Sequence, residues 1–214
     1  MSSAPARPAP LAPEILTHAT LGYHCARLST WVFGALWFRE RYEGREHLPQ
    51  QGGVVVVSNH QSFYDIPVLS HAIARHVSFV ARDTLANFAP LAWLMRTCGA
   101  VLIKRGAPDR AALREMVTHL ERGDCLAVFP EGTRTVDGRV SEFKAGALLA
   151  ARMAKVPIVP CSIRGSFEAL PKGARFPRPK KIRVRFGAPI DSSLPDALER
   201  AHAAVTEMTG DGRA

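Results

Sequence analysis

Short apolar segments alternate with segments of helical periodicity from residue 46 onward, and this alternation limits the fold more than any other feature. The pattern predicts strands near 53–58, 77–81, 100–104, 125–129, 157–161 and 181–186, and helices near 64–75, 84–97, 109–122, 144–154 and 194–208. Strands that alternate with helices form a mostly parallel sheet, because a parallel connection needs a long crossover. The sequence therefore predicts the α/β class, with helices on both faces of the sheet.

Length and composition predict one domain with appendages. The chain has 214 residues, of which 47% are hydrophobic, so it can bury one substantial core but is short for two. Residues 1–14 are rich in Pro and Ala without periodicity, which predicts a disordered tail. We expect apolar or amphipathic membrane-docking helices over residues 15–44 and the globular domain over residues 45–214.

The apolar stretch at 15–38 is divided by Arg27 into two pieces, each too short to span a bilayer. A spanning helix with a central arginine would cost about 2.5–3.5 kcal/mol. The stretch also lacks the basic segment and the cleavage pattern of a signal peptide. It predicts one or two helices in the membrane interface. The expected lipid contacts are Trp31, Phe33, Trp37 and Phe38, with Arg39 and Arg41 among the headgroups. The alternative is a helix packed on the domain's own core.

The formal charge of +9 and the pI near 9.9 predict an anionic partner, such as nucleic acid, an acidic leaflet, a phosphorylated substrate or an acidic carrier. No helix-turn-helix, zinc or RNA-stacking signature accompanies this charge, which argues against nucleic acid. The four cysteines are widely spaced without a Cys-x-x-Cys pair, so neither a metal site nor a disulfide framework is expected. A reducing cytoplasm is the simplest location.

The segment Asn59–Asp65 directly follows the apolar run at 53–58. In a continuous helix, residues with the spacing of His60 and Asp65 would point about 140° apart, so the two can meet only across a turn. We expect Asp65 in the first turn of the next helix, where Pro67 is tolerated. Its carboxylate could hold one imidazole nitrogen and leave the other free to take a proton from a hydroxyl group. The alternative is a turn histidine beside a helix N-cap.

Two other predicted strands are also followed by polar groups. One ends in Lys104 and Arg105, which offer fixed positive charge for a phosphate. Another precedes the segment 129–135, which combines a glycine with hydroxyl and guanidinium donors. Taken alone, this segment is better explained as a polar loop in which Glu131 and Arg134 pair with each other.

The three strand ends together carry groups of complementary type: a base with its orienting carboxylate, a cationic anchor, and a Gly-Thr-Arg loop. The carboxyl ends of parallel strands converge on one edge of a sheet. The shared site suits a hydroxyl nucleophile that is carried by a phosphorylated molecule.

Four ordered segments resemble the motifs of the lysophosphatidate (1-acylglycerol-3-phosphate) acyltransferases. They are Asn59–Asp65, Gly99–Arg105, Phe129–Arg134 and Val156–Pro160. Two further segments, Phe143–Gly146 and Phe186–Ile190, also resemble that family, so the resemblance covers about residues 45 to 190.

The departures from the family pattern are small. Leu102 stands where the family usually has Phe, Thr135 where Ser is common, and Cys161 where an aliphatic residue is usual. None of them removes a catalytic group, although Leu102 can alter the fit of the acyl chain.

The resemblance implies a glycerol-3-phosphate acyltransferase-like fold. It also implies transfer of a fatty acyl group from acyl-CoA or acyl-carrier protein to the 2-hydroxyl of lysophosphatidate, giving phosphatidate. His60 would be the general base and Asp65 its orienting partner. Arg105 would hold the acceptor phosphate, and the pocket would be completed by Lys104, Glu131, Gly132, Thr133 and Arg134. The hydroxyl would attack the thioester directly, so neither a cofactor nor a cysteine nucleophile is expected.

A lipid substrate requires membrane contact. We therefore expect a peripheral or monotopic protein at the cytoplasmic face of the cell membrane, with an anionic membrane surface as a partner. The stretch Lys172–Arg185 holds seven cations and no acid, which makes it a candidate patch for headgroups or for a carrier; a solvated strand and loop is the alternative. The segment at 84–97 has hardly any polar residue, so it predicts either an acyl-chain tunnel, a membrane-facing wall or plain core.

Other functions remain open at this point. The same motifs could serve another acceptor, such as a lyso-ornithine lipid, a lysophospholipid or glycerol 3-phosphate. A non-catalytic basic protein that binds membranes or nucleic acid is a second alternative, although such a protein has no need of His60 and Asp65. A thioester hydrolase is a third, and the Gly-x-Ser-x-Gly elbow of many hydrolases is absent from the sequence.

Overall fold

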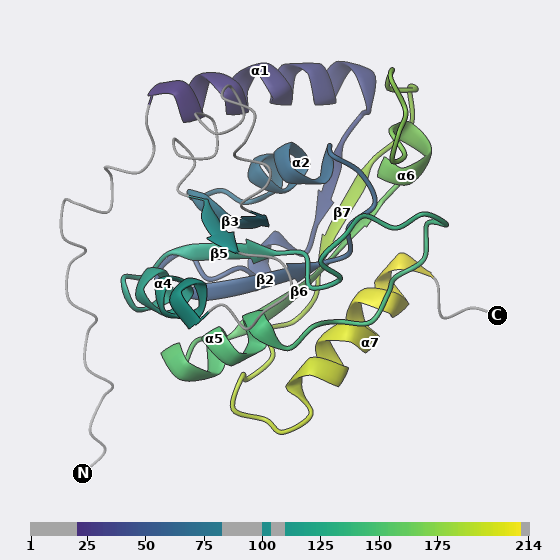
Figure 1. The fold of residues 1–214 in the computed structure, drawn as a ribbon. Coiled ribbons are helices and arrows are strands. Elements are labelled where there is room, and N and C mark those ends of the chain that lie inside the picture. Colours follow the sequence, from purple (N-terminus) through teal and green to yellow (C-terminus); the bar gives the residue numbers. More distant parts are fainter. Residues whose placement is uncertain (1–20, 83–99, 104–109, 211–214) are drawn as a thin grey trace, which may run out of the picture.

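The computed structural model describes residues 21–82, 100–103 and 110–210 (Figure 1). Within these residues the sheet has seven strands, in the order β1-β7-β6-β2-β5-β3-β4. The strands are β1 (Arg41–Glu43), β2 (Val54–Ser58), β3 (Val77–Arg82), β4 (Val101–Ile103), β5 (Cys125–Val128), β6 (Ile158–Arg164) and β7 (Arg183–Phe186). The helices are α1 (Leu21–Trp37), α2 (Asp65–Ala72), α4 (Arg110–Glu121), α5 (Gly146–Ala154), α6 (Ser166–Ala169) and α7 (Ala197–Thr209), with a 3₁₀ helix η2 (Arg45–His47).

Neighbouring strands run parallel except β6 and β7, which are antiparallel. The predicted mostly parallel α/β sheet is therefore confirmed. Because β2, β3, β5 and β6 run in one direction, their carboxyl ends meet at one edge of the sheet, which we call the catalytic edge. The strand β1 pairs with β7 and was not predicted, because its three residues form no apolar run.

The strand β2 lies at the centre of the sheet, and its five residues are all buried. Val54 and Val56 belong to the hydrophobic core on one face, while Val55 and Val57 belong to the core on the other. This alternation explains why the segment is apolar without interruption: both faces of a central parallel strand are covered.

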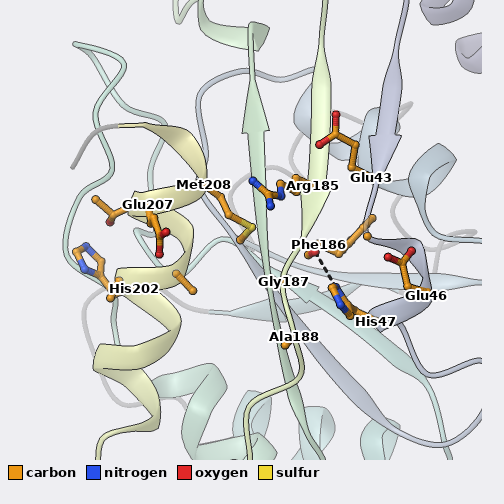
Figure 2. Close-up of a pocket in the computed structure, with 14 residues that line it drawn as sticks. Glu43, Glu46, His47, Arg185, Phe186, Gly187, Ala188, His202, Glu207 and Met208 are labelled. Atoms are coloured by element: carbon orange, nitrogen blue, oxygen red, sulfur yellow. Dashed lines mark hydrogen bonds between the residues drawn. The ribbon is translucent and has the colours of Figure 1, made fainter. Parts of the chain in front are cut away.

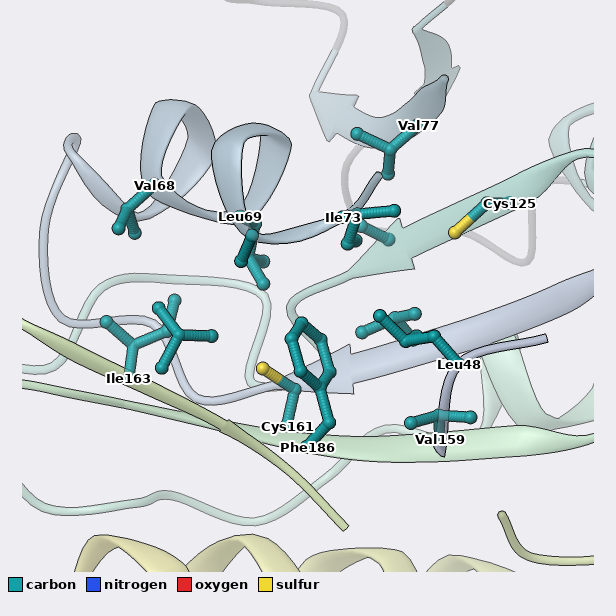
Figure 3. Packing of buried hydrophobic residues seen from close by; sticks show 14 of the residues in the cluster. Leu48, Val68, Leu69, Ile73, Val77, Cys125, Val159, Cys161, Ile163 and Phe186 are labelled. Atoms are coloured by element: carbon teal, nitrogen blue, oxygen red, sulfur yellow. The ribbon is translucent and has the colours of Figure 1, made fainter. Parts of the chain in front are cut away.

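Helices cover both faces of the sheet (Figure 1). The helices α1 and α2 lie on one face, and α4, α5 and α7 lie on the other. Figure 3 shows Leu69 and Ile73, from α2 and the residue after it, packed toward Val159 and Phe186 of the sheet. The two cores together hold the catalytic edge in a fixed geometry, because close-packed interiors resist deformation.

A buried polar cluster attaches α1 to α2. His71 of α2 donates from Nδ1 to Glu40 at 3.0 Å, and its Nε2 lies 2.9 Å from the Thr30 hydroxyl of α1. Tyr64 donates to the other carboxylate oxygen of Glu40 at 2.8 Å, and Tyr42 also donates to this carboxylate. Burial and the adjacent carboxylate raise the pKa of Tyr64 well above its ordinary value, so its hydroxyl stays protonated.

The helix α1 keeps one apolar face exposed. The exposed side chains on it include Leu28, Trp31, Val32 and Leu36, with helical spacing, and Leu36 is 78% exposed. Phe38 differs from the prediction, because it is fully buried against Tyr64 and belongs to the core rather than to a lipid-facing surface. Among the described residues, no helix combines the length and the hydropathy needed to cross a membrane.

The remaining predicted elements are present with shifted bounds. The strand β6 continues to Arg164 because Ser162 and Ile163 are buried and pair with β7. The helix α2 ends earlier than predicted, at Ala72. The short helices η2 and α6 were not predicted, since segments of three or four residues show no period. The predicted helix near 84–97 lies outside the described residues.

Candidate active site

The segment after β2 is tied to β6 by Asn59. Its side-chain amide donates to the carbonyl of Ile163 at 2.9 Å, and its carbonyl oxygen accepts from the Ile163 N–H at 2.8 Å. Asn59 thus continues the pairing of the two strands by one residue and fixes the position of His60, the next residue. The sequence motif contained Asn59, but nothing in the sequence pointed to this partner.

His60 and Asp65 form a hydrogen-bonded pair, as the predicted turn requires. His60 Nδ1 lies 2.9 Å from Asp65 Oδ2, and the Asp65 side chain is fully buried whereas that of His60 is 15% exposed. A carboxylate accepts hydrogen bonds, so the pairing assigns the proton to Nδ1 of a neutral imidazole. The other ring nitrogen, Nε2, then carries a lone pair that can accept a proton.

The carboxylate of Asp65 also organises the turn itself. Its Oδ2 accepts the backbone N–H groups of Gln61 at 2.6 Å and Ser62 at 2.7 Å. Asp65 is the first residue of α2, and the residue at the N-cap position is Tyr64. Asp65 therefore reaches back into the loop instead of capping the helix. The backbone N–H groups of Gln61 and Ser62 are therefore already engaged by this carboxylate.

Phe129 covers the imidazole of His60. The two rings are stacked at 4.0 Å between centroids with 16° between planes. A cavity of about 360 Å³ begins at Phe129 and Pro130. Its lining is mostly apolar and includes Val80, Ile103, Leu113, Met116 and Leu149, with Arg110 and Lys144 as the cations. His60 therefore lies beside an apolar cavity.

Glu131 supports the backbone around His60. Its carboxylate accepts the His60 N–H at 2.7 Å and the Ser141 N–H at 3.1 Å. The N–H of Thr135 in turn donates to the His60 carbonyl at 2.9 Å. Burial raises the pKa of the Glu131 carboxyl above its ordinary value, and the two N–H donors partly oppose this shift. Among the described residues no ion pair joins Glu131 to Arg134.

Arg134 lies over the ring of Phe63, with 3.7 Å between the guanidinium carbon and the ring centroid. Burial lowers the pKa of the Arg134 guanidinium below its ordinary value, and the charge of Asp65 partly opposes this shift. Phe63 belongs to the turn between His60 and Asp65, so Arg134 covers this turn. Gly132 has a φ of +71°, a left-handed conformation that favours glycine. Thr133, between the two, is exposed to solvent.

The structure therefore brings together His60, Asp65 and the segment 131–134 at the catalytic edge. Lys104 and Arg105, the predicted phosphate anchors, lie outside the described residues. Sequence reasoning missed the covering ring of Phe129, although its position directly before the Pro-Glu-Gly-Thr-Arg segment was a signal. Among the described residues, no group of three or more His, Cys, Asp or Glu side chains could hold a metal ion.

A larger hollow, of about 960 Å³, lies away from these residues (Figure 2). It is found between α7 on one side and β7 with the η2 segment on the other. Its lining includes Glu43, Arg185, His202 and Glu207, so its charges are mixed. None of the predicted site residues lines it.

Comparisons with known proteins identify relatives of this chain. The sequence model of the Acyltransferase family matches residues 39–164. The chloroplastic 1-acyl-sn-glycerol-3-phosphate acyltransferase LPAT1 of Arabidopsis thaliana is 32% identical over 166 residues, which cover 76% of this chain and 46% of the relative. A probable 1-acyl-sn-glycerol-3-phosphate acyltransferase of Mycoplasma pneumoniae is 34% identical over 168 residues, covering 68% of this chain and 59% of the relative. The chain spans about half the length of the curated relatives it matches.

A solved structure has the same fold. The crystal structure of the 1-acyl-sn-glycerophosphate (LPA) acyltransferase PlsC from Thermotoga maritima matches with a TM-score of 0.76 and 30% sequence identity, covering 90% of this chain and 80% of that chain. The family model matches more than half of the chain and includes the segments around His60 and Glu131. The chain therefore belongs to the acyltransferase family that includes the 1-acyl-sn-glycerol-3-phosphate acyltransferases.

Proposed function

We propose that this protein transfers a fatty acyl group from a thioester donor to the 2-hydroxyl of lysophosphatidate and so produces phosphatidate. The observation that carries the proposal is the pair of His60 and Asp65, which leaves Nε2 as a proton acceptor beside an apolar cavity. The names of the relatives support the choice of acceptor.

In the proposed reaction, His60 Nε2 takes the proton of the acceptor hydroxyl as its oxygen attacks the thioester carbonyl. The buried carboxylate of Asp65 holds the imidazole ring and stabilises the imidazolium that forms. The tetrahedral intermediate then collapses, the C–S bond breaks, and the imidazolium returns the proton to the leaving thiolate. No covalent acyl-enzyme is required. The buried Cys161 is a poor nucleophile, because burial raises the pKa of its thiol above the ordinary value.

We assign the acceptor phosphate to the cations at the catalytic edge. Arg134 lies over Phe63 in the turn between His60 and Asp65, and the exposed residue Thr133 is adjacent to it in sequence. Lys104 and Arg105 are proposed to complete the phosphate site with Gly132. Glu131 is proposed to act through His60, because both oxygens of its carboxylate already accept backbone N–H groups.

We assign the acyl chain to the apolar cavity beside Phe129. Its volume of about 360 Å³ and its mostly apolar lining favour a hydrocarbon ligand. The ring of Phe129 would separate the chain from His60 and exclude water from the imidazole, which favours transfer over hydrolysis.

Membrane contact is assigned to the exposed apolar face of α1. A helix with exposed Trp, Leu and Val side chains beside basic residues is typical of an interfacial helix. The loop at 171–181 adjoins this helix, since Trp37 donates to the Pro177 carbonyl at 3.4 Å, and Phe176 in this loop is 81% exposed. We propose peripheral or monotopic binding at the cytoplasmic face of an anionic membrane.

The test is acyl transfer to lysophosphatidate in mixed micelles, with acyl-CoA and acyl-carrier protein as alternative donors, for the parent protein and for His60→Ala. We expect loss of the base to lower kcat by about 10²–10⁴-fold. The matched control is His119→Ala, because His119 pairs with Asp124 at the same sequence spacing, at 2.7 Å, and lies on α4.

Each outcome has a definite meaning. Phosphatidate formed by the parent and by His119→Ala, but not by His60→Ala, supports the reaction and its base together. Release of free fatty acid without acylated product would indicate a hydrolase. Acylation of lysophosphatidylcholine or of a lyso-ornithine lipid, but not of lysophosphatidate, would show that the acceptor is assigned wrongly while the chemistry is right.

A further inference from the structure

Three arginines lie side by side across β1, β7 and β6. Arg41 of β1 is in register with Arg183 of β7, and Arg183 is in register with Arg164 of β6. Residues in register on neighbouring strands project from the same face of a sheet. All three side chains are exposed. This arginine row is about 10 Å long, because neighbouring strands are about 4.7–4.9 Å apart.

The arginine row is unfavourable within the protein itself, since like charges opposite each other on neighbouring strands destabilise a sheet. Among the described residues, no carboxylate lies within ion-pair distance of any of the three. Further along β7, Arg185 is in register with Glu43, and both line the hollow of Figure 2 together with Glu207. Carboxylates therefore accompany Arg185 in the hollow, whereas in the row only Arg164 has a negative neighbour among the described residues, the C-terminal end of α7 at Gly210. The remaining positive charge of the row indicates an anionic partner.

The arginine row projects from the face of the sheet opposite α1. Ile182 and Val184 pack in the same core cluster as Phe38, so Arg183 between them points to the other face, where α7 lies. Figure 2 shows the next exposed residue, Arg185, on the side of Met208 in α7. A bilayer in contact with the exposed face of α1 would thus lie on the far side of the sheet, which favours a soluble partner over lipid headgroups.

The arginine row is also close to the catalytic loop. Arg164 directly follows Ile163, and both backbone groups of Ile163 are bound by Asn59. Asn59 is the residue before His60. A partner that binds the row is therefore positioned beside the catalytic edge, on the side away from the membrane.

We propose that the arginine row docks an acidic helix of acyl-carrier protein, which delivers the thioester from the aqueous side. The inference rests on the proposed acyl transfer and names its donor. Carboxylates three or four residues apart on a helix are about 5–6 Å apart, close to the spacing between strands, so successive arginines can each face one. The arginine row presents its positive charge along a line. A helix with carboxylates along one side fits this line better than the clustered phosphate groups of CoA do.

The first test measures binding without catalysis, by fluorescence anisotropy of labelled holo acyl-carrier protein titrated with the full chain. Arg183→Glu should weaken binding by about tenfold at low salt, and the parent's affinity should fall as salt rises. The variant is not expected to unfold, because Glu at this position can pair with Arg41 and Arg164. The matched control is Arg114→Glu, which changes the same charge at an exposed position on α4 and should bind as the parent does.

The second test compares the KM for acyl-carrier protein and for acyl-CoA bearing the same acyl chain. Arg183→Glu and Arg183→Gln should raise the KM for the carrier, with kcat and the KM for acyl-CoA unchanged. An equal rise for both donors would overturn the inference in favour of CoA phosphates, and weaker binding to vesicles of 30% phosphatidylglycerol would overturn it in favour of lipid. Unchanged carrier binding would also overturn it. Carrier binding that depends on Arg183 in a protein that transfers no acyl group would preserve the docking surface and contradict the proposed function.

Discussion

At the scale of single residues, the neighbours of a side chain decide its role. Two His–Asp pairs in this chain have the same spacing and similar bond lengths, 2.9 Å for His60 with Asp65 and 2.7 Å for His119 with Asp124. Only His60 has its backbone held by Glu131 and Thr135 and its ring covered by Phe129. The spacing in the sequence predicted a His60–Asp65 contact across a turn, but the surroundings of that pair come from segments about 70 residues away.

A residue-scale prediction concerns Glu131→Gln. The amide of Gln would turn its NH₂ toward the N–H of either His60 or Ser141, so we expect a loss of about 1–3 kcal/mol in the free energy of unfolding. The Glu131 pKa is raised in the folded protein, above an ordinary value of 4.5. The folded protein therefore binds the Glu131 proton more tightly than the unfolded chain does. The free energy of unfolding falls as the pH rises through the pKa of Glu131 in the folded protein.

The variant lacks this titration, so the stability difference between parent and variant should be largest below about pH 4.5 and should narrow as the pH rises. Urea unfolding midpoints measured from pH 4 to pH 8 would check this. The control is Glu142→Gln, at an exposed position, which should match the parent within about 0.5 kcal/mol. A stability difference between parent and Glu131→Gln that widens with rising pH would contradict the raised pKa of Glu131.

At the scale of elements, α1 depends on a close approach that only glycine permits. A Cβ on Gly34 would overlap the Glu40 carboxylate and the Tyr64 hydroxyl, which belong to the buried polar cluster between α1 and α2. The apolar stretch at 15–38 predicted one or two helices, yet it could not show which face is buried. Phe38 illustrates this, because its neighbours in sequence are exposed while it fills the core.

The corresponding prediction is that Gly34→Ala destabilises the protein by about 1–3 kcal/mol, because the added methyl forces the cluster apart. For a chain of this size the melting temperature should fall by about 2–4 °C for each kcal/mol. Gly146→Ala is the matched control, since no atom lies within 4 Å of a Cβ built at this position at the start of α5. Alanine there should be neutral or stabilising by up to about 1 kcal/mol. Equal melting temperatures for both variants would show that α1 does not pack as described.

At the scale of the whole molecule, both faces of one sheet are covered by continuous cores, and the polar cluster links α1 to this structure. We therefore expect one cooperative unfolding transition. With Trp93 replaced by Phe, tryptophan fluorescence would report only Trp31 and Trp37 of α1, while circular dichroism would report the sheet and all helices. The two urea curves should coincide. Loss of the fluorescence signal at a lower urea concentration would mean that α1 detaches before the domain unfolds.

The sequence by itself determined the class of fold and the order of the chemical groups along the chain. Continuous apolar runs and helical periods are local properties, so β2, α4 and the turn between His60 and Asp65 could be predicted from residues that are close in sequence. Motif resemblance suggested the proposed reaction, because the four segments occur in one order.

Tertiary structure decided everything that depends on contacts between distant segments. The partner of Asn59 is Ile163, the carboxylate of Glu131 binds a backbone group instead of Arg134, and three arginines from three strands form one row. The basic stretch Lys172–Arg185 was continuous in sequence, yet Arg183 and Arg185 in its strand point to the face of α7 whereas its loop adjoins α1. Strand order and register set these neighbours, and they follow from packing of the whole chain, which no local pattern encodes.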